Sequence, residues 1–299
     1  MSTAAGLPAR PSLGARLFVI GVGFMFGSGA LLAKFAYQGG TNTLSVMVVR
    51  TIAALAWLVL FLRLTGVPVM LPPTQRWRAL AIGVLLITNT FGLYYAFEHM
   101  PAPLAILNFY IFPILVALVQ TLTGRERMTA RKAAALVLAF GGLALALGSG
   151  TLQPTLAGVI SATCGAIGFT AIFALTERLF PGGDSRPRTA HMLVTANVIF
   201  LVAAAVTHQF TLPHTPSGWV GFIGVCITFP LAVTGFFMSV GRVPASETAI
   251  LMNFEPLTVL AGSALLFDER LEGLQIVGAI LVLTAIVIVQ LPSRRQRLT

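Results

Sequence analysis

The chain has 299 residues, of which 57% are hydrophobic and only 9% are charged, and its mean hydropathy is +0.90. A soluble globule of this length needs more polar surface, so we expect a protein of the lipid bilayer. The net charge of +10 does not indicate a nucleic-acid partner, because nearly all basic residues stand between apolar runs, where anionic lipid and membrane topology account for them.

Ten apolar runs are long enough to cross about 30 Å of hydrocarbon as helices. The first follows Arg10 and Arg16 as a signal peptide would, but nine more runs favour an uncleaved span. The runs are continuously apolar, which predicts an all-α integral membrane protein and not a barrel. The predicted spans lie near residues 14–36, 44–64, 79–98, 102–123, 131–149, 155–177, 189–207, 217–240, 244–267 and 272–291.

The predicted fourth and ninth spans are two versions of one sequence. A shift of 143 positions places residues 101–127 (PAPLAILNFYIFPILVALVQTLTGRER) on residues 244–270 (PASETAILMNFEPLTVLAGSALLFDER). Pro101 then coincides with Pro244, Pro113 with Pro256, and a Glu-Arg pair ends both stretches. Such matches at one offset indicate a duplication. We therefore divide the chain into two five-helix repeats, residues 1–152 and 153–299.

Basic residues are distributed unequally between the two sides of the predicted membrane. One side collects nearly all Lys and Arg residues, whereas the other has Lys34 and Arg270. We expect the protein in the inner (plasma) membrane, and the positive-inside rule then predicts that both termini are cytoplasmic. Five crossings per repeat is an odd number, so the second repeat is expected to be inverted relative to the first. An inverted repeat is typical of secondary transporters.

Three stretches resemble a known family: FGSGALLAKFA in the first predicted span, NFYIFPILVAL followed by GRER, and NFEPLTVLAGSALLFDERL. They look like the EamA repeats of the drug/metabolite transporter superfamily, in particular its ten-helix exporters, over essentially the whole chain. The pattern departs at Gly124, where the second repeat has Phe267 and Asp268. The likeness is greatest to the YddG-type amino-acid exporters, which implies export of aromatic and other bulky amino acids or related small metabolites.

Polar side chains at mid-bilayer depth are costly and normally face the interior or a wet cavity. The 143-residue shift superposes Tyr110 on Asn253 and puts Asn108 one helical turn before Glu255, which predicts a central substrate cavity between the repeats. Interhelical hydrogen bonds explain the asparagines equally well. We expect Arg50 to pair with Glu98 or a backbone carbonyl. The polar residues well inside predicted spans are Arg50, Asn89, Asn108, Asn197, Asn253 and Glu255.

Glu255 is the only acidic residue in the interior of a predicted span. It lies about 16 Å along the ninth span at 1.5 Å per residue, close to the midplane. A carboxyl group there must be protonated, pair with a cation or bind the ammonium group of a substrate. The alternative is a neutral acid that donates to a carbonyl freed by Pro256.

Several other residues each allow a functional and a structural interpretation. Thr88 and Tyr95 share one face of the third span, where aromatic rings suit an aromatic substrate but also suit an interfacial belt. Lys34 either lines the cavity mouth or extends to water. Pro113 and Pro256 predict a kink or a hinge in their spans. The helix-packing motif GxxxG is formed by Gly23 and Gly27.

The sequence favours a transporter that works by alternating access without ATP, because no phosphate-binding glycine loop is present. An exporter of drugs or quaternary ammonium compounds is the alternative. An intramembrane enzyme is disfavoured, because the four histidines lie near span ends and show no metal-ligand spacing. We expect no metal and no cofactor, a small-molecule substrate and the lipid bilayer as partners, and either a monomer or a homodimer.

Overall fold

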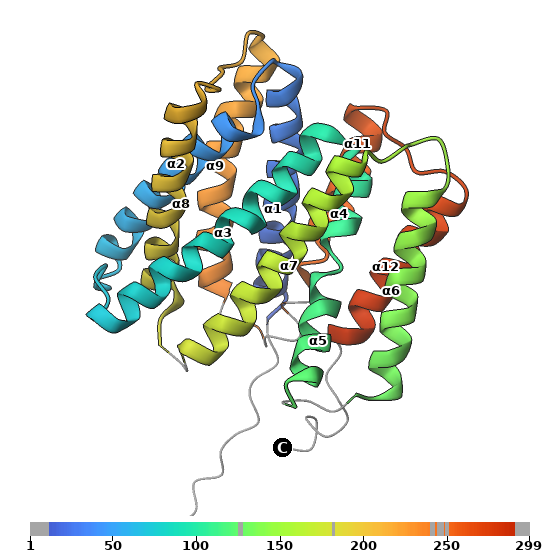
Figure 1. The fold of residues 1–299 in the computed structure, drawn as a ribbon, viewed down its shortest axis with the longest axis horizontal. Coiled ribbons are helices and arrows are strands. Elements are labelled where there is room, and N and C mark those ends of the chain that lie inside the picture. The colour runs from blue at the N-terminus through green and yellow to red at the C-terminus, as the bar shows by residue number, and fades with distance from the viewer. Residues whose placement is uncertain are drawn as a thin grey trace, which may run out of the picture.

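A computed structural model describes residues 12–124, 128–180, 183–239, 243, 248 and 251–290 (Figure 1). Arg10, the Glu-Arg pair at 126–127 and the start of the predicted ninth span, with Pro244, lie outside these residues. The helices are α1 (Leu13–Gln38), α2 (Thr43–Leu64), α3 (Pro73–His99), α4 (Ala102–Phe109), α5 (Phe112–Leu122), α6 (Ala130–Gly148), α7 (Leu156–Leu179), α8 (Ser185–Thr207), α9 (Pro216–Ser239), α11 (Phe254–Leu266) and α12 (Leu274–Gln290).

Among the described residues, eight helical segments are long and apolar enough to cross a membrane, with Ala102–Leu122 counted as one of them, and α11 and α12 are two shorter apolar helices. The predicted all-α membrane fold with ten spans is thereby confirmed for the described residues. Helix starts follow from short polar side chains that accept a hydrogen bond from a first-turn backbone N–H. These N-caps are Ser12, Asn42, Thr129, Thr155 and Asp184.

The contacts between the two repeats occur in reciprocal pairs. Helix α1 packs on α9 as α7 packs on α3, α2 on α9 as α8 on α3, and α1 on α11 as α7 on α5. Helix α6 packs on its own counterpart α12, and α2 on α8. Reciprocity of this kind is what a two-fold relation between the repeats requires. With five spans in each repeat, this two-fold relation makes the second repeat inverted.

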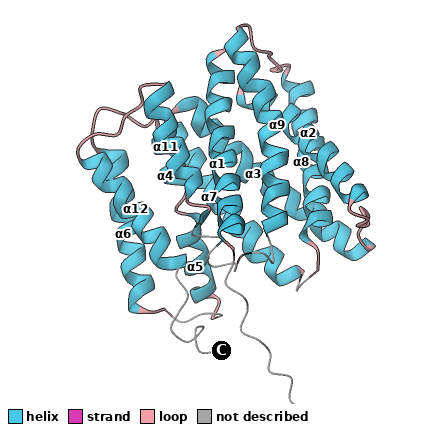
Figure 2. Ribbon diagram, turned by 180° about the vertical axis from the view of Figure 1, so that it is seen from behind, coloured by secondary structure: helices cyan, strands magenta, loops and turns pink. Residues whose placement is uncertain are grey.

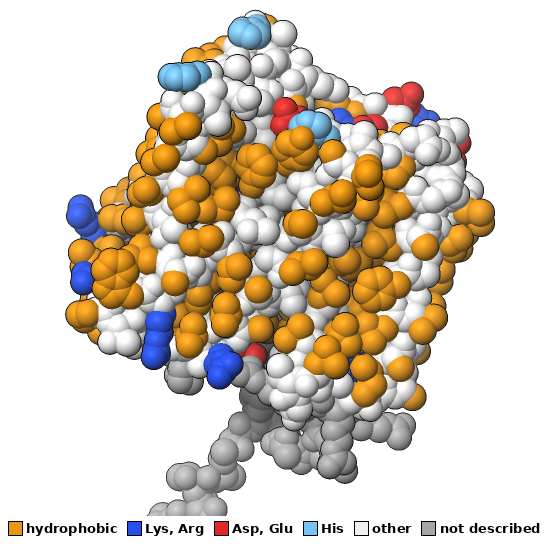
Figure 3. All heavy atoms as spheres, in the orientation of Figure 1, with side chains coloured by type: hydrophobic (Ala, Val, Ile, Leu, Met, Phe, Trp, Pro, Cys, Tyr) orange, Lys and Arg blue, Asp and Glu red, His pale blue; other side chains and the backbone are white. Residues whose placement is uncertain are grey.

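The helices form one broad bundle. Helices α6 and α12 lie together at one edge, α2, α8 and α9 lie at the other, and α1, α3, α4, α7 and α11 lie between them (Figures 1 and 2). All residues of α4 are buried, so α4 is a central element of the core. Hydrophobic side chains cover most of the face seen in Figure 3, with most of the visible Lys and Arg toward its lower left and the visible His and most of the Asp and Glu at its upper end.

The predicted fourth span is not one continuous helix. Helix α4 ends at Phe109 and α5 begins at Phe112, with Pro113 in its first turn. In the second repeat α11 begins only at Phe254, just before Pro256. Proline cannot donate the backbone hydrogen bond that would continue a helix, so each span is interrupted within the four residues before its proline. The residues at these interruptions form the centre of the candidate site.

Candidate functional site

A tyrosine and a glutamate meet between the two repeats at these interruptions. Tyr110 is the C-terminal capping residue of α4 and is buried, and Glu255 lies in the first turn of α11. The Tyr110 hydroxyl donates a hydrogen bond of 2.7 Å to Glu255 Oε2. Two residues that the sequence proposed for the cavity therefore touch, and each comes from the interrupted span of a different repeat.

Glycines on α1 bring Glu255 to this position. A Cβ atom at Gly27 would lie 2.7 Å from the Glu255 carbonyl oxygen and 2.7 Å from Thr258 Cβ. A Cβ atom at Gly23 would lie 3.4 Å from the Glu255 backbone nitrogen. The two glycines of the GxxxG motif therefore face the first turn of α11 and allow its backbone to approach α1 closely.

The counterpart of Glu255 in the first repeat, 143 positions earlier, is Phe112. Its ring packs against those of Tyr110 at 5.5 Å, Phe109 at 5.5 Å and Phe169 at 4.6 Å between centroids. Thus the same structural position carries an acid in one repeat and an aromatic ring in the other. The duplicated fold accepts an apolar side chain there, so the carboxyl group is not a requirement of the fold.

Arg50 lies in the first half of α2 and is 3% exposed. Its guanidinium carbon lies 3.6 Å from the centroid of the Phe229 ring and 4.2 Å from that of Tyr94, and Nη1 contacts Met47 Sδ at 3.5 Å. The expected pairing with Glu98 is wrong, because Glu98 instead accepts hydrogen bonds from the backbone N–H and hydroxyl of Thr43 at 2.9 and 2.5 Å.

This aromatic enclosure of Arg50 escaped sequence reasoning because it joins three helices distant in sequence: α2, α3 and α9. The Tyr94 side chain is 6% exposed and faces the guanidinium. Ring contacts are worth roughly 2 kcal/mol each when desolvated, whereas desolvation of one ion costs several kcal/mol. The two rings together therefore offset about 4 kcal/mol of this cost, but they give Nε no acceptor among the described residues. A signal was present in the sequence, since Arg50 is the one charge in the interior of an apolar span whose other arginine, Arg63, lies at its end.

Three of the predicted polar residues make hydrogen bonds between helices. Asn108 donates to Val159 O at 2.9 Å and accepts from the Thr163 hydroxyl at 3.2 Å, both on α7. Asn89 donates to Gly165 O at 3.4 Å, and Asn197 exchanges hydrogen bonds of 2.9 and 3.1 Å with Thr51. These contacts hold α7 and α8 to the first repeat, and none of them reaches Glu255.

Asn253 directly precedes α11, in which Glu255 is the second residue, and is 7% exposed. The structure thus keeps Asn253 next to the Tyr110–Glu255 contact.

The remaining third-span candidates lie elsewhere. Tyr95 stacks between Phe91 at 5.7 Å and His99 at 3.8 Å, and the His99 ring nitrogen Nδ1 contacts the Tyr95 carbonyl at 3.0 Å. Thr88 is exposed and lies beside Gly168 of α7. The structure does not bring either residue to Glu255.

Lys34 forms an ion pair with Glu269, which follows α11, and the side chains of both are largely buried. The second carboxylate oxygen of Glu269 accepts a hydrogen bond of 3.1 Å from the backbone N–H of Ala102, the first residue of α4. This carboxylate therefore joins α1, the end of α11 and the start of α4. A cavity of about 410 Å³ opens beside it, lined among others by Lys34, Glu98 and His99.

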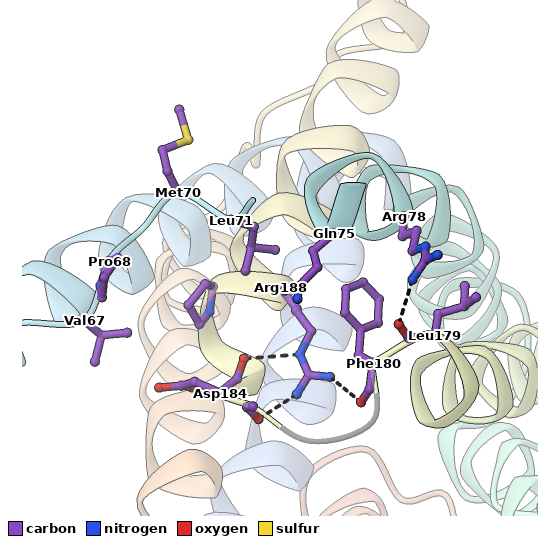
Figure 4. A pocket seen from close by; sticks show the side chains of 12 residues that line it. Val67, Pro68, Met70, Leu71, Gln75, Arg78, Leu179, Phe180, Asp184 and Arg188 are labelled. Carbon is purple, nitrogen blue, oxygen red and sulfur yellow. Dashed lines mark hydrogen bonds between the residues drawn. The ribbon is translucent and has the colours of Figure 1, made fainter. Parts of the chain in front are cut away.

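A second cavity, of about 490 Å³, lies at the opposite end, between the α2–α3 and α7–α8 connections (Figure 4). Arg188 within it donates to the carbonyls of Asp184, Phe180 and Gly183 at 3.2, 3.3 and 3.0 Å. Arg186 hydrogen-bonds to the Asp184 carboxylate and holds the pKa of that group below its usual value. Arg188 thus orders the α7–α8 connection. Among the described residues no group of His, Cys, Asp and Glu is arranged to hold a metal ion.

Comparisons with known proteins agree with this architecture. The model of the EamA-like transporter family matches residues 13–148 and 156–291. An uncharacterized transporter of Bacillus subtilis (strain 168), YvbV, is 25% identical over 229 residues, which cover 75% of each chain. A solved structure described as "Crystal structure of protein" has the same fold, with a TM-score of 0.66 and 16% identity over 92% of this chain and 97% of that chain.

Proposed function

Since this chain belongs to the EamA-like transporter family, within the drug/metabolite transporter superfamily, we propose that it is a secondary transporter that exports amino acids with bulky or aromatic side chains. The family consists of membrane transporters and not of enzymes. In the proposed cycle the two repeats alternate in opening a central site to either side of the inner membrane, with both chain termini in the cytoplasm.

The observation that carries this proposal is the contact of Tyr110 with Glu255 between the repeats. A carboxyl group at this depth is expensive, and its counterpart Phe112 indicates that the fold does not need it. A substrate ammonium group would give the carboxylate a charged partner and replace the hydrogen bond to Tyr110. Because that bond joins the repeats, its replacement offers a way to couple binding to their relative motion.

The rings beside this contact support a bulky side chain in the substrate. Phe109, Tyr110, Phe112 and Phe169 form a continuous group with centroid distances of 4.6 to 6.2 Å. Aromatic rings in offset or edge-to-face contact bind another ring without needing a specific polar group. This agrees with the resemblance to the YddG-type amino-acid exporters.

The ion pair of Lys34 with Glu269 supports alternating access. Together with the bond from Ala102 it joins elements of both repeats at the end opposite to the α2–α3 and α7–α8 connections. We interpret it as the closed outer end of the pathway. Opening of this end then requires Glu269 to leave Lys34, Ala102 or both.

Export of an organic cation such as a quaternary ammonium drug is the second candidate function. It is favoured by one observation, namely that Glu255 lies next to aromatic rings, which also bind cations. Purified protein in liposomes, assayed with labelled aromatic and small amino acids and with a labelled quaternary ammonium compound, separates the two functions. We expect movement of the aromatic amino acids above the rate of protein-free liposomes. Movement of the quaternary ammonium compound alone would replace the first function by the second.

A further inference from the structure

Arg50 is buried in a manner unlike the other buried arginine of the described chain, Arg188. All three guanidinium nitrogens of Arg188 donate to backbone carbonyls (Figure 4). Arg50 is at least as well buried, yet Nη1 meets only the weak acceptor Met47 Sδ, and Nε has no hydrogen-bond partner among the described residues. A guanidinium group with unused donors in a dry interior is a strong site for an anion, above all for a carboxylate, whose two oxygens match its geometry.

The repeat shows that the fold does not need this charge. The counterparts of Arg50, Tyr94 and Phe229, at the 143-residue spacing of the two family matches, are Leu193, Phe237 and Leu86. These three residues belong to one hydrophobic cluster, in which Leu193 is 4% exposed. The same place in the other repeat is therefore filled with apolar side chains. Arg50, like Glu255, is a charge at a position where its repeat counterpart is apolar.

Arg50 and Glu255 both lie in the part of the bundle around α1 but do not pair, since no ion pair within 4.0 Å joins them. Helix α1 connects their surroundings through two adjacent residues: a Cβ atom at Gly27 would meet the Glu255 backbone, and the Phe26 ring lies 6.3 Å between centroids from the Phe229 ring that covers the Arg50 guanidinium. A fixed positive and a fixed negative group are thus held apart beside the same stretch of α1.

On the basis of the proposed function, we propose that Arg50 binds the carboxylate of the transported amino acid while Glu255 binds its ammonium group, so that the protein selects zwitterions. Arg50 then determines specificity, since a carboxylate gives its unused donors acceptors, whereas an organic cation or an amine gains nothing from them. The rings of Tyr94 and Phe229 hold the guanidinium in place, so that little side-chain freedom is lost when the carboxylate binds.

Competition against labelled phenylalanine in proteoliposomes tests this assignment with three competitors: unlabelled phenylalanine, its amide, and the amine that lacks the carboxylate. For the wild-type protein we expect phenylalanine to compete at least about 30-fold better than the amide or the amine. Arg50→Gln should bring phenylalanine close to the amide and leave the amide unchanged. Arg50→Lys should fall between them, because an ammonium group keeps the charge but loses the paired geometry.

Arg78→Gln is the matched control, since it removes the same charge from an exposed arginine that donates to Leu179 O at 3.3 Å. It should leave the ratio of phenylalanine to amide unchanged. The assignment is overturned if the wild-type protein treats the three competitors alike, a result that requires no variant to fold. It is also overturned if folded Arg50→Gln keeps the wild-type ratio. In both cases amino-acid transport itself would stand, whereas failure of the wild-type protein to move any amino acid would overturn the proposed function and this assignment with it.

Discussion

Substitution of Gly27 by alanine tests how α1 positions Glu255. The added Cβ would lie 2.7 Å from the Glu255 carbonyl oxygen and from Thr258 Cβ, which is much shorter than an ordinary van der Waals contact of 3.4–4 Å. Neither atom is the end of a flexible side chain, so α11 must shift, at an overpacking cost of about 1–3 kcal/mol. Alanine regains up to about 1 kcal/mol of helix propensity. The expected net loss of stability, from the middle of these two ranges, is about 1–2 kcal/mol, or roughly 2–3 °C in Tm for a chain of 299 residues.

Two glycines of the same helix serve as controls for Gly27→Ala. A Cβ at Gly23 meets its nearest atoms at 3.4 Å, and one at Gly21 meets nothing within 4 Å. We expect Gly23→Ala to be close to neutral and Gly21→Ala to raise Tm slightly through helix propensity. Thermal unfolding in detergent gives the order, and uptake into proteoliposomes should fall only for Gly27→Ala. A Gly27→Ala protein with the Tm and uptake of the wild type would refute this account of the α1–α11 contact.

Two further outcomes are expected, both in a background without the native cysteines. Lys34→Gln removes the ion pair to Glu269, and a cysteine in place of Met100, a buried residue that lines the adjacent cavity, reports on access. This cysteine should react with a maleimide at least about threefold faster in the Lys34→Gln protein than in the parent with Lys34. An unchanged rate would contradict a closing role for the ion pair. With an impermeant maleimide on intact cells, a cysteine at Glu272 should react and one at Lys132 should not, whereas reaction of both from the same side would contradict the inverted orientation.

The sequence was sufficient for the overall fold because the relevant signals are local or repeated. Span length, polar caps such as Asn42 and Thr155, and the 143-residue shift each depend on short stretches of sequence. The sequence predicted the interruption of the fourth span only in outline. Pro113 indicated a break, but whether it bends one helix or separates two depends on the packing of α4 and α5 in the core.

The candidate site was predicted less completely, because its contacts join helices that are distant in sequence. The proposed cavity residues Tyr110 and Glu255 were found by the cost of a mid-span carboxyl group and by the repeat. Asn108 has the same depth and polarity, yet its hydrogen bonds face α7. Nothing in the periodicity of α2 indicates that Arg50 lies between aromatic rings of α3 and α9 and not against Glu98. Such choices are decided by which helices become neighbours.

The central claim, that a carboxyl group between the repeats binds the ammonium group of a transported amino acid, is tested most directly by one exchange measurement. Proteoliposomes loaded with unlabelled phenylalanine take up labelled phenylalanine through the wild-type protein or through Glu255→Gln, which keeps the shape of the side chain. We predict that exchange through the folded variant is at least about tenfold slower, because the charge-assisted hydrogen bond to the ammonium group is lost. Exchange at the wild-type rate through a variant with wild-type Tm would contradict the claim and make Glu255 a structural residue.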